Sequence, residues 1–210
     1  MIPVGKGDLV EVRRLAPADL GAFQAAMPAW NAHEYARRIG FQERGLAVQL
    51  VAWVGTQPAG RAMVVFPGHP EWSPSAYREG CPEVRDLGVA PAWRRRGIAT
   101  ALVAAAERET RSAGFARLGL GVGIDDDYAA ARSLYERLGY VFAHGPFVQA
   151  ARLETDDGLA LPVAGVCTYL VKELPECCHT VSPRRFSDPA GTAAWRTGRS
   201  SASRSCTRPR

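Results

Sequence analysis

Three neighbouring arginines and a glycine form the segment of this chain best suited to bind phosphates. They lie in the run Val89-Ala90-Pro91-Ala92-Trp93-Arg94-Arg95-Arg96-Gly97-Ile98-Ala99, which follows an apolar stretch typical of a strand. Helical spacing begins after Gly97, and the unpaired N–H groups at a helix start attract anions. Glycine lets an anion approach the backbone closely, and the guanidinium groups add positive charge and forked donors. The segment therefore predicts a phosphate-binding turn between a strand and a helix.

Two carboxylates on the preceding strand, Glu83 and Asp86, could remove a proton from an amine. An alkyl amine has a pKa near 10 and is mostly protonated at neutral pH, so its use as a nucleophile requires a base. Because side chains alternate along a strand, these two residues should face opposite sides. Either could instead form an ion pair with Arg85 or another arginine.

The spacing Arg94-x-x-Gly97-x-Ala99 resembles the Arg/Gln-x-x-Gly-x-Gly/Ala signature of the GCN5-related N-acetyltransferases, the GNAT superfamily. A second family-like block, Ala131-Arg132-Ser133-Leu134-Tyr135-Glu136-Arg137-Leu138-Gly139-Tyr140, follows at the expected distance. The resemblance covers about residues 9–174 and is tightest over 83–140. It implies acetyl-CoA as cosubstrate and direct transfer of the acetyl group to a primary amine in a ternary complex. The alternative is a noncatalytic module that binds or senses acyl-CoA.

The resemblance also implies roles for individual residues. Glu83 would be the catalytic base, with Asp86 as the second choice, and Tyr135 would be the acid that protonates the departing thiolate. The family usually has an asparagine seven residues before this tyrosine, where this chain has Tyr128. The residues implied in binding acetyl-CoA are Leu87, Gly88, Val89, Arg94, Arg95, Arg96, Gly97, Ile98, Ala99 and Thr100. Gly88 would permit a bulge and a close backbone approach, and no metal is expected.

The order of the predicted elements indicates an α/β fold. Residues 9–15 should form a strand, two helical stretches should follow, and residues 46–54 and 61–66 should form a hairpin. The central strand is expected at 83–89, followed by a helix after Gly97, a strand at 116–124 and a second helix. Strands at 140–150 and 163–174 complete a mixed, mostly antiparallel sheet of six to seven strands flanked by helices. By resemblance, its two central strands should splay apart.

The amine acceptor should bind between three segments, 26–44, 67–82 and 140–162. Residues 67–82 are rich in proline and read as a loop. Aromatic side chains within or near these segments are Trp30, Trp72 and Tyr77, and acidic ones are Glu34, Glu71 and Glu79. Each of these could equally be an ordinary surface residue, so the acceptor stays open between a small-molecule amine and a peptide amine. The family resemblance also leaves a homodimer open.

Charge and composition separate the end of the chain from the rest. The net charge is +5, and the segment from Glu176 onward holds seven arginines against two acids. This segment has few aliphatic residues, which is typical of disorder. The prediction is an acetyltransferase domain over 1–174 and a basic, disordered tail over 175–210. Nucleic acid, if bound at all, would bind through that tail.

The five cysteines are an odd number at irregular spacing, so no disulfide framework is expected. The sequence starts without the apolar segment of a secretory signal, and no apolar run is long enough to span a membrane. These observations predict a cytoplasmic protein with no membrane partner.

Overall fold

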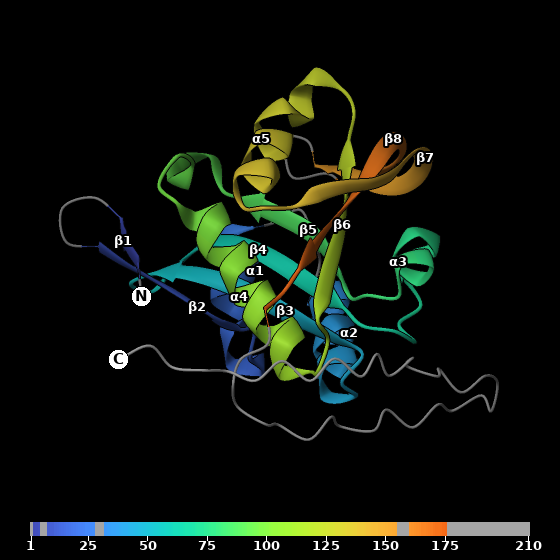
Figure 1. Ribbon diagram of the computed structural model, residues 1–210. Helices are drawn as coiled ribbons and strands as arrows, with labels where there is room; N and C mark the ends of the chain where they lie inside the picture. Colours follow the sequence, from blue (N-terminus) through green and yellow to red (C-terminus); the bar gives the residue numbers. More distant parts are fainter. Residues whose placement is uncertain (1, 5–7, 28–31, 155–159, 176–210) are drawn as a thin grey trace, which may run out of the picture.

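The computed structural model describes residues 2–4, 8–27, 32–154 and 160–175 of the 210-residue chain (Figure 1). Its eight strands form one open mixed sheet in the order β1-β2-β3-β4-β5-β6-β8-β7. The strands are β1 (Ile2–Val4), β2 (Asp8–Arg14), β3 (Ala47–Val54), β4 (Gln57–Val65), β5 (Glu83–Val89), β6 (Arg117–Gly123), β7 (Val141–Glu154) and β8 (Ala160–Glu173). All neighbouring strands are antiparallel except β5 and β6. The predicted mixed, mostly antiparallel sheet is confirmed, and short β1 adds a strand that the sequence analysis did not foresee.

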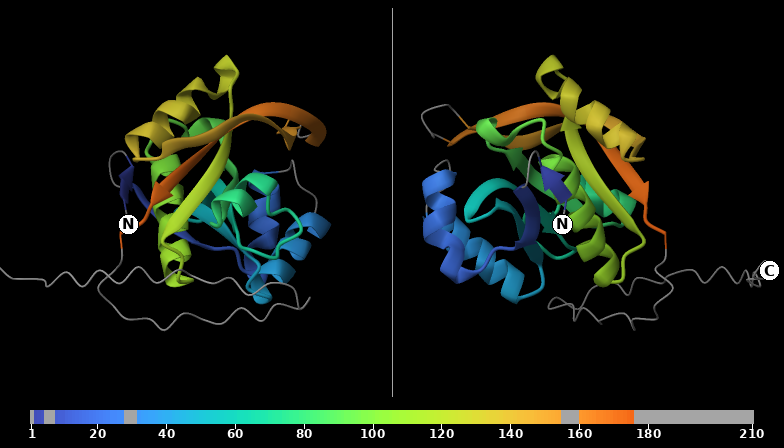
Figure 2. Two further views of the ribbon diagram at one scale, coloured as in Figure 1. Left: turned by 45° about the vertical axis from the view of Figure 1, so that its right-hand side comes forward. Right: turned by 90° about the vertical axis from the view of Figure 1, so that its left-hand side faces the viewer.

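Helices cover both faces of the sheet (Figure 2). On one face lie α4 (Ile98–Ser112) and α5 (Ala129–Arg137), and on the other lie α1 (Leu20–Ala26) and α2 (Ala32–Glu43). Strand β3 is buried along its whole length because both faces are covered. Its side chains alternate: Leu50 packs in the cluster that includes α4, whereas Val51 packs in the cluster that includes α1 and α2.

The buried stripe of α4 follows the spacing read from the sequence. Ile98, Ala101, Leu102 and Ala105 are all buried in the main core. These side chains recur at one face of a 3.6-residue period, so the helix is anchored to the sheet from its first residue. The start of α4 is thereby held at the end of β5, because only the short 3₁₀ turn Pro91–Trp93 and residues 94–97 separate them.

Strands β5 and β6 separate shortly after they begin. They pair in parallel only at Glu83 with Gly119 and at Val84 with Leu120. From Arg85 onward, β5 has no paired partner on β6 in the described part of the chain. The backbone N–H and C=O groups along this edge of β5 are consequently free of strand pairing, and the Val89 carbonyl accepts a hydrogen bond from Arg94. The splayed central pair implied by the family resemblance is thus present.

A β-bulge lies at the same position on the other edge of β5. Arg61 of β4 pairs with Gly88, whereas Met63 pairs with Arg85, so the register shifts between them. Asp86 adopts a positive φ of 54°, an uncommon conformation for a residue with a side chain. Gly88, which the sequence analysis expects to permit a bulge, borders this irregularity through its pairing with Arg61. The distortion falls at Asp86, where its ion pairs with arginines hold the backbone.

Residues 67–82 were expected to form a loop throughout. The structure instead contains a short helix, α3 (Pro74–Glu79), within them. Ser73 caps it by accepting a hydrogen bond from the Ala76 N–H, and Gly80 ends it in the left-handed conformation. The sequence Ser-Pro followed by a glycine six residues later contained these signals. The predicted disordered tail lies, apart from its first residue, outside the described residues.

Candidate active site

The arginine-rich turn between β5 and α4 has the geometry of an anion site. Gly97 precedes α4 in the left-handed conformation with φ of 79°, and no atom lies within 4 Å of where a Cβ would stand. Arg94, Arg95 and Arg96 are exposed around it. Two of these side chains have contacts: Arg94 donates to the Val89 carbonyl at 3.2 Å, and Arg96 lies 5.0 Å over the Trp93 ring. The open backbone and three exposed guanidinium groups fit a pyrophosphate.

The other residues predicted to bind acetyl-CoA lie along this same path. Leu87, Gly88 and Val89 are partly buried on the edge of β5 that β6 leaves unpaired. Ala99 and Thr100 are partly buried in the first turn of α4. Ile98 differs, because its side chain is 1% exposed and belongs to the core. It can therefore contribute only its backbone to a ligand.

Glu83 lies at the point where β5 and β6 separate, and its side chain is fully buried. Burial raises the pKa of this carboxyl, and the charge of Arg85, whose Nη1 is 3.8 Å from Oε2, only partly opposes that shift. Oε2 accepts a hydrogen bond from the Ser73 N–H at 3.3 Å. Oε1 is buried with no hydrogen bond of good geometry in the described part of the chain, although the Gln149 amide lies near enough to help lower the pKa. A carboxyl with a raised pKa at a fork between strands is suited to act as a general base.

Asp86 instead forms ion pairs with two arginines. Arg61 donates to both of its oxygens at 3.1 Å, and Arg38 donates to Oδ2 at 2.6 Å. Burial by itself would raise the pKa of Asp86, but the charges of Arg61 and Arg38 outweigh it and lower the pKa. A carboxylate so paired is a weak proton acceptor, which leaves Glu83 as the better-placed base.

Tyr135 is a core residue as well as a candidate acid. Its side chain is 6% exposed and its ring packs edge-on against Tyr140, with centroids 5.9 Å apart. Burial raises the pKa of Tyr135 to about 12, so the hydroxyl keeps its proton at neutral pH. Tyr128, which replaces the family's asparagine, lies over Gly123 so closely that a Cβ there would be 2.4 Å from its ring.

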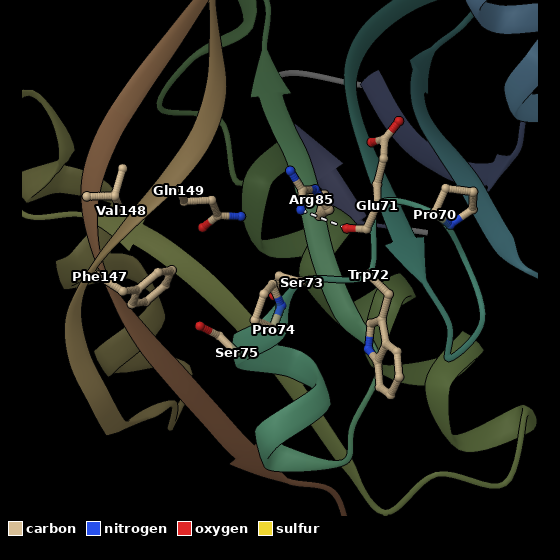
Figure 3. A pocket seen from close by; sticks show the side chains of 10 residues that line it. All are labelled: Pro70, Glu71, Trp72, Ser73, Pro74, Ser75, Arg85, Phe147, Val148 and Gln149. Atoms are coloured by element: carbon tan, nitrogen blue, oxygen red, sulfur yellow. Dashed lines mark hydrogen bonds between the residues drawn. The ribbon is translucent and has the colours of Figure 1, made fainter. Parts of the chain in front are cut away.

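A cavity of about 410 Å³ opens between α3, β5 and β7 (Figure 3). Residues 70–75, Arg85 and residues 147–149 line it, so its walls come from the segment before α3 and the first turn of α3, from β5 and from β7. Figure 3 shows Gln149 reaching from β7 toward Arg85 on β5. Two lining residues, Ser73 and Arg85, also contact the Glu83 carboxyl. The cavity therefore lies next to the candidate base, at the mouth of the fork.

Alternate glycines on β6 make room for the side chains around this cavity. A Cβ at Gly121 would overlap the Gln149 amide oxygen, and one at Gly119 would overlap both the hydroxyl and the ring of Tyr169. The run Gly119-Leu120-Gly121-Val122-Gly123 looks like part of a nucleotide-binding loop, but it is strand β6. Its glycines allow Gln149 and Tyr169 to lie against the strand.

Two of the three segments expected to bind the acceptor line the cavity, and 26–44 does not. Trp72 is in the wall, whereas Tyr77 is 60% exposed, lies outside the wall and packs edge-on against the Trp72 ring. Trp30 lies outside the described residues. The three acids expected to attract a cation are each bound to arginine: Glu34 and Glu71 to Arg37, and Glu79 to Arg117. The sequence analysis did not identify Arg85, Phe147 or Gln149 as residues of the acceptor site. The one signal for them was the alternation of glycines on β6, which indicates that side chains from other segments lie against that strand.

Cys81 has no part in this chemistry. It is fully buried beside Tyr169, and burial raises the pKa of its thiol to about 11. A thiol in that state is a poor nucleophile at neutral pH. Direct attack by the acceptor, without a cysteine intermediate, fits these surroundings.

Comparison with known proteins agrees with this fold. The sequence model of the Acetyltransferase (GNAT) family matches residues 13–140, and the chain belongs to that family. No curated protein sequence matches the chain significantly. The part of the chain that the structure describes contains no helix both long and apolar enough to cross a membrane.

Solved structures share the fold at low sequence identity. An N-acetyltransferase from Staphylococcus aureus Mu50 has 16% identity and a TM-score of 0.57, covering 80% of this chain and 99% of its own. A ribosomal-protein-alanine N-acetyltransferase from Brucella melitensis has 21% identity and a TM-score of 0.55, covering 78% and 99%. The putative acetyltransferase yncA from Salmonella typhimurium, solved with acetyl-CoA, has 18% identity and a TM-score of 0.55, covering 82% and 98%. At such identities these likenesses concern the fold alone.

Proposed function

We propose that this protein is an N-acetyltransferase that moves an acetyl group from acetyl-CoA to a primary amine by direct attack. The observation that carries the proposal is the fork: β5 leaves β6 immediately after Glu83 and Val84, and the exposed turn at Gly97 follows the far end of the same strand. One strand therefore connects a phosphate-sized anion site to a buried carboxyl beside a cavity. Family membership supports acyl transfer, and the Salmonella relative was solved with acetyl-CoA.

Binding is assigned to the turn and to the free edge of β5. The pyrophosphate would contact the backbone at residues 94–100, with Arg94, Arg95 and Arg96 around it. The pantetheine amides would pair with backbone groups of Leu87 and Val89, which have no strand partner on that side. Fixing the thioester in this way converts a bimolecular reaction into one between positioned groups.

Glu83 would accept the proton that the amine loses. The amine nitrogen attacks the thioester carbonyl carbon, a C–N bond forms, the C–S bond breaks, and one amine proton passes to Glu83 directly or through a water molecule. The raised pKa of Glu83 makes it a stronger base than an ordinary carboxylate, although a larger fraction of it is protonated at low pH.

Tyr135 would act on the departing sulfur. A thiol has an ordinary pKa of about 8.5, lower than the pKa of about 12 at Tyr135. Complete proton transfer from tyrosine to sulfur is therefore uphill. The hydroxyl would contribute mainly by donating a hydrogen bond to the developing thiolate, which lowers the energy of the transition state.

Two measurements on the full chain test the proposal. Calorimetric titration should show acetyl-CoA binding, and release of the CoA thiol should be faster with amines than with water alone. Binding without turnover over a broad panel of small amines, polyamines and peptides would favour a noncatalytic acyl-CoA-binding module. Absence of acetyl-CoA binding by the folded protein would contradict the proposal outright.

A further inference from the structure

The charges around the cavity beside Glu83 do not suit a simple cationic acceptor. Glu71 is the one carboxylate among the lining residues, and its Oε1 is 2.8 Å from Arg37, so its charge is already neutralised. His69, next to it, has its pKa lowered to about 4 by burial and is neutral at pH 7. A polyamine would find no uncompensated negative group in these walls.

Arg85 gives the cavity a positive charge. Its Nη1 donates to the Glu71 backbone carbonyl at 2.9 Å, which orients the guanidinium without neutralising it. Its nearest carboxylate is Glu83, at 3.8 Å. That distance exceeds an ordinary hydrogen bond, and burial disfavours the charged form of Glu83. Arg85 therefore lies in the wall of the cavity with one weak ionic partner among the described residues.

The remaining walls are apolar or carry neutral polar groups. The Trp72 indole is held by a 3.1 Å hydrogen bond from Nε1 to the Cys81 carbonyl, and Phe147 packs near the rings of His144 and Tyr169. The Gln149 amide lies opposite Arg85 (Figure 3). Preformed apolar walls with a few converging polar groups are typical of small-molecule sites.

We propose that the acceptor is a free α-amino acid whose carboxylate binds Arg85 in the cavity wall while its amine lies on the side of the cavity next to the buried Glu83, to which its proton passes directly or through a water molecule. The inference rests on the proposed function and narrows its substrate class. The 3.8 Å between Arg85 Nη1 and Glu83 Oε2 requires the anionic and amine groups of the acceptor to be close together. In an α-amino acid they share one carbon. Peptide N-termini and polyamines have no carboxylate beside the amine, so both are excluded as good acceptors.

The test compares matched acceptors on the full-length protein. Initial rates of CoA release at saturating acetyl-CoA are measured for the standard α-amino acids, for the corresponding amides and for the decarboxylated amines, and the products are checked by mass spectrometry. The best amino acid should exceed its own amide and amine by at least about 30-fold in kcat/KM, the effect expected for a charge-assisted contact. Carboxylates that lack the amine should inhibit competitively with the acceptor, and neutral amides should not.

A substitution identifies the residue responsible. Arg85→Met should reduce the ratio of kcat/KM for the amino acid to kcat/KM for its amide by about 30-fold. Any change shared by the two acceptors reports the loss of the Arg85 charge beside Glu83. The matched control is Arg78→Met, which removes an exposed arginine of α3 outside the cavity wall. This control variant should change kcat/KM neither for the amino acid nor for its amide.

Three outcomes would overturn the inference. An amide, a decarboxylated amine or a peptide that is acetylated faster than every amino acid would refute it and leave the proposed function standing. An Arg85→Met variant in which kcat/KM falls equally for the amino acid and for its amide would show that the arginine does not recognise the carboxylate. No turnover with any amine, despite acetyl-CoA binding, would refute the proposed function itself.

Discussion

Arg61 on β4 holds both carboxylate oxygens of Asp86 on β5 at 3.1 Å, across the bulge that bends β5. Asp86 has a positive φ of 54°, and Arg38 from α2 binds the same carboxylate at 2.6 Å. Backbone strain of this kind costs about 1 kcal/mol or more. The two arginines offset that cost and fix the course of β5 where it leaves β6. Asp86 is thus held in ion pairs that fix the backbone, whereas Glu83, the proposed base, has no such pair of close arginines.

Removing the Asp86 charge should therefore destabilise the protein. Asp86→Asn leaves Arg38 and Arg61, which are 2% and 7% exposed, without their shared anion. Breaking a buried pair of this kind costs roughly 3 kcal/mol, measured as the free energy of unfolding in urea at pH 7. The exposed Asp126→Asn is the control and should stay within about 0.5 kcal/mol of the wild type.

The same ion pairs of Asp86 with Arg38 and Arg61 predict that the stability of the protein depends on pH. Because the arginines lower the pKa of Asp86, the folded state binds fewer protons than the unfolded state at pH values between the folded and the unfolded pKa of this carboxyl. The stabilisation is fully present above the unfolded pKa of about 3.9 and is lost as the pH falls through the lower folded value. As the pH falls through this interval, the free energy of unfolding should decrease less in Asp86→Asn than in the wild type. An equal loss in both proteins would show that the pair does not contribute.

Glu83→Gln should separate activity from stability. Removal of a general base lowers kcat/KM by about 100-fold or more, and the low-pH decline of the wild-type rate should occur above the ordinary carboxyl range because the pKa of Glu83 is raised. Burial of the charge costs stability as the pH rises above the unfolded pKa of about 4.3. The variant should consequently be at least as stable as wild type at pH 7 in thermal unfolding. A variant that is both unstable and inactive would point to a structural role.

Tyr135→Phe should lower turnover more than it lowers acetyl-CoA affinity. The ring still fills the core beside Tyr140, and only the hydroxyl that is proposed to assist the leaving sulfur is lost. We expect kcat to fall by about 100-fold, while the calorimetric Kd changes by less than about 3-fold. The control is Tyr77→Phe, an exposed tyrosine outside the cavity wall. Unchanged turnover in Tyr135→Phe would remove this residue from the mechanism.

Gly97→Glu should abolish acetyl-CoA binding without unfolding the protein. A carboxylate in the open space at φ of 79° would repel the phosphates. The matched control is Gly45→Glu, which introduces the same charge and a similar strain at φ of 71°, in an equally open position in the turn between α2 and β3. Calorimetry should show no binding in the first variant and wild-type affinity in the second. If both bind equally well, the phosphate site is elsewhere.

The sequence by itself was sufficient for the parts of the protein that depend on local chemistry. The spacing of apolar residues predicted α4 and its buried face, and Gly97 after three arginines predicted the shape of the turn. Both depend on backbone periodicity and on the freedom of glycine, which neighbouring residues determine. The short helix α3 was missed although its cap signals were present, because proline-rich stretches more often form loops.

Contacts between distant segments were decided only by the tertiary structure. Two carboxylates three residues apart on one strand look equivalent in the sequence, and the fold distinguishes them. Asp86 meets Arg38 and Arg61 from α2 and β4 and stays ionised, whereas Glu83 is buried at the fork and its pKa rises. Arg85 lines a cavity because the fold brings Gln149, over sixty residues away in the sequence, to the same cavity wall. Burial and charge are set by whatever the fold brings close, and neither can be read from the order of residues alone.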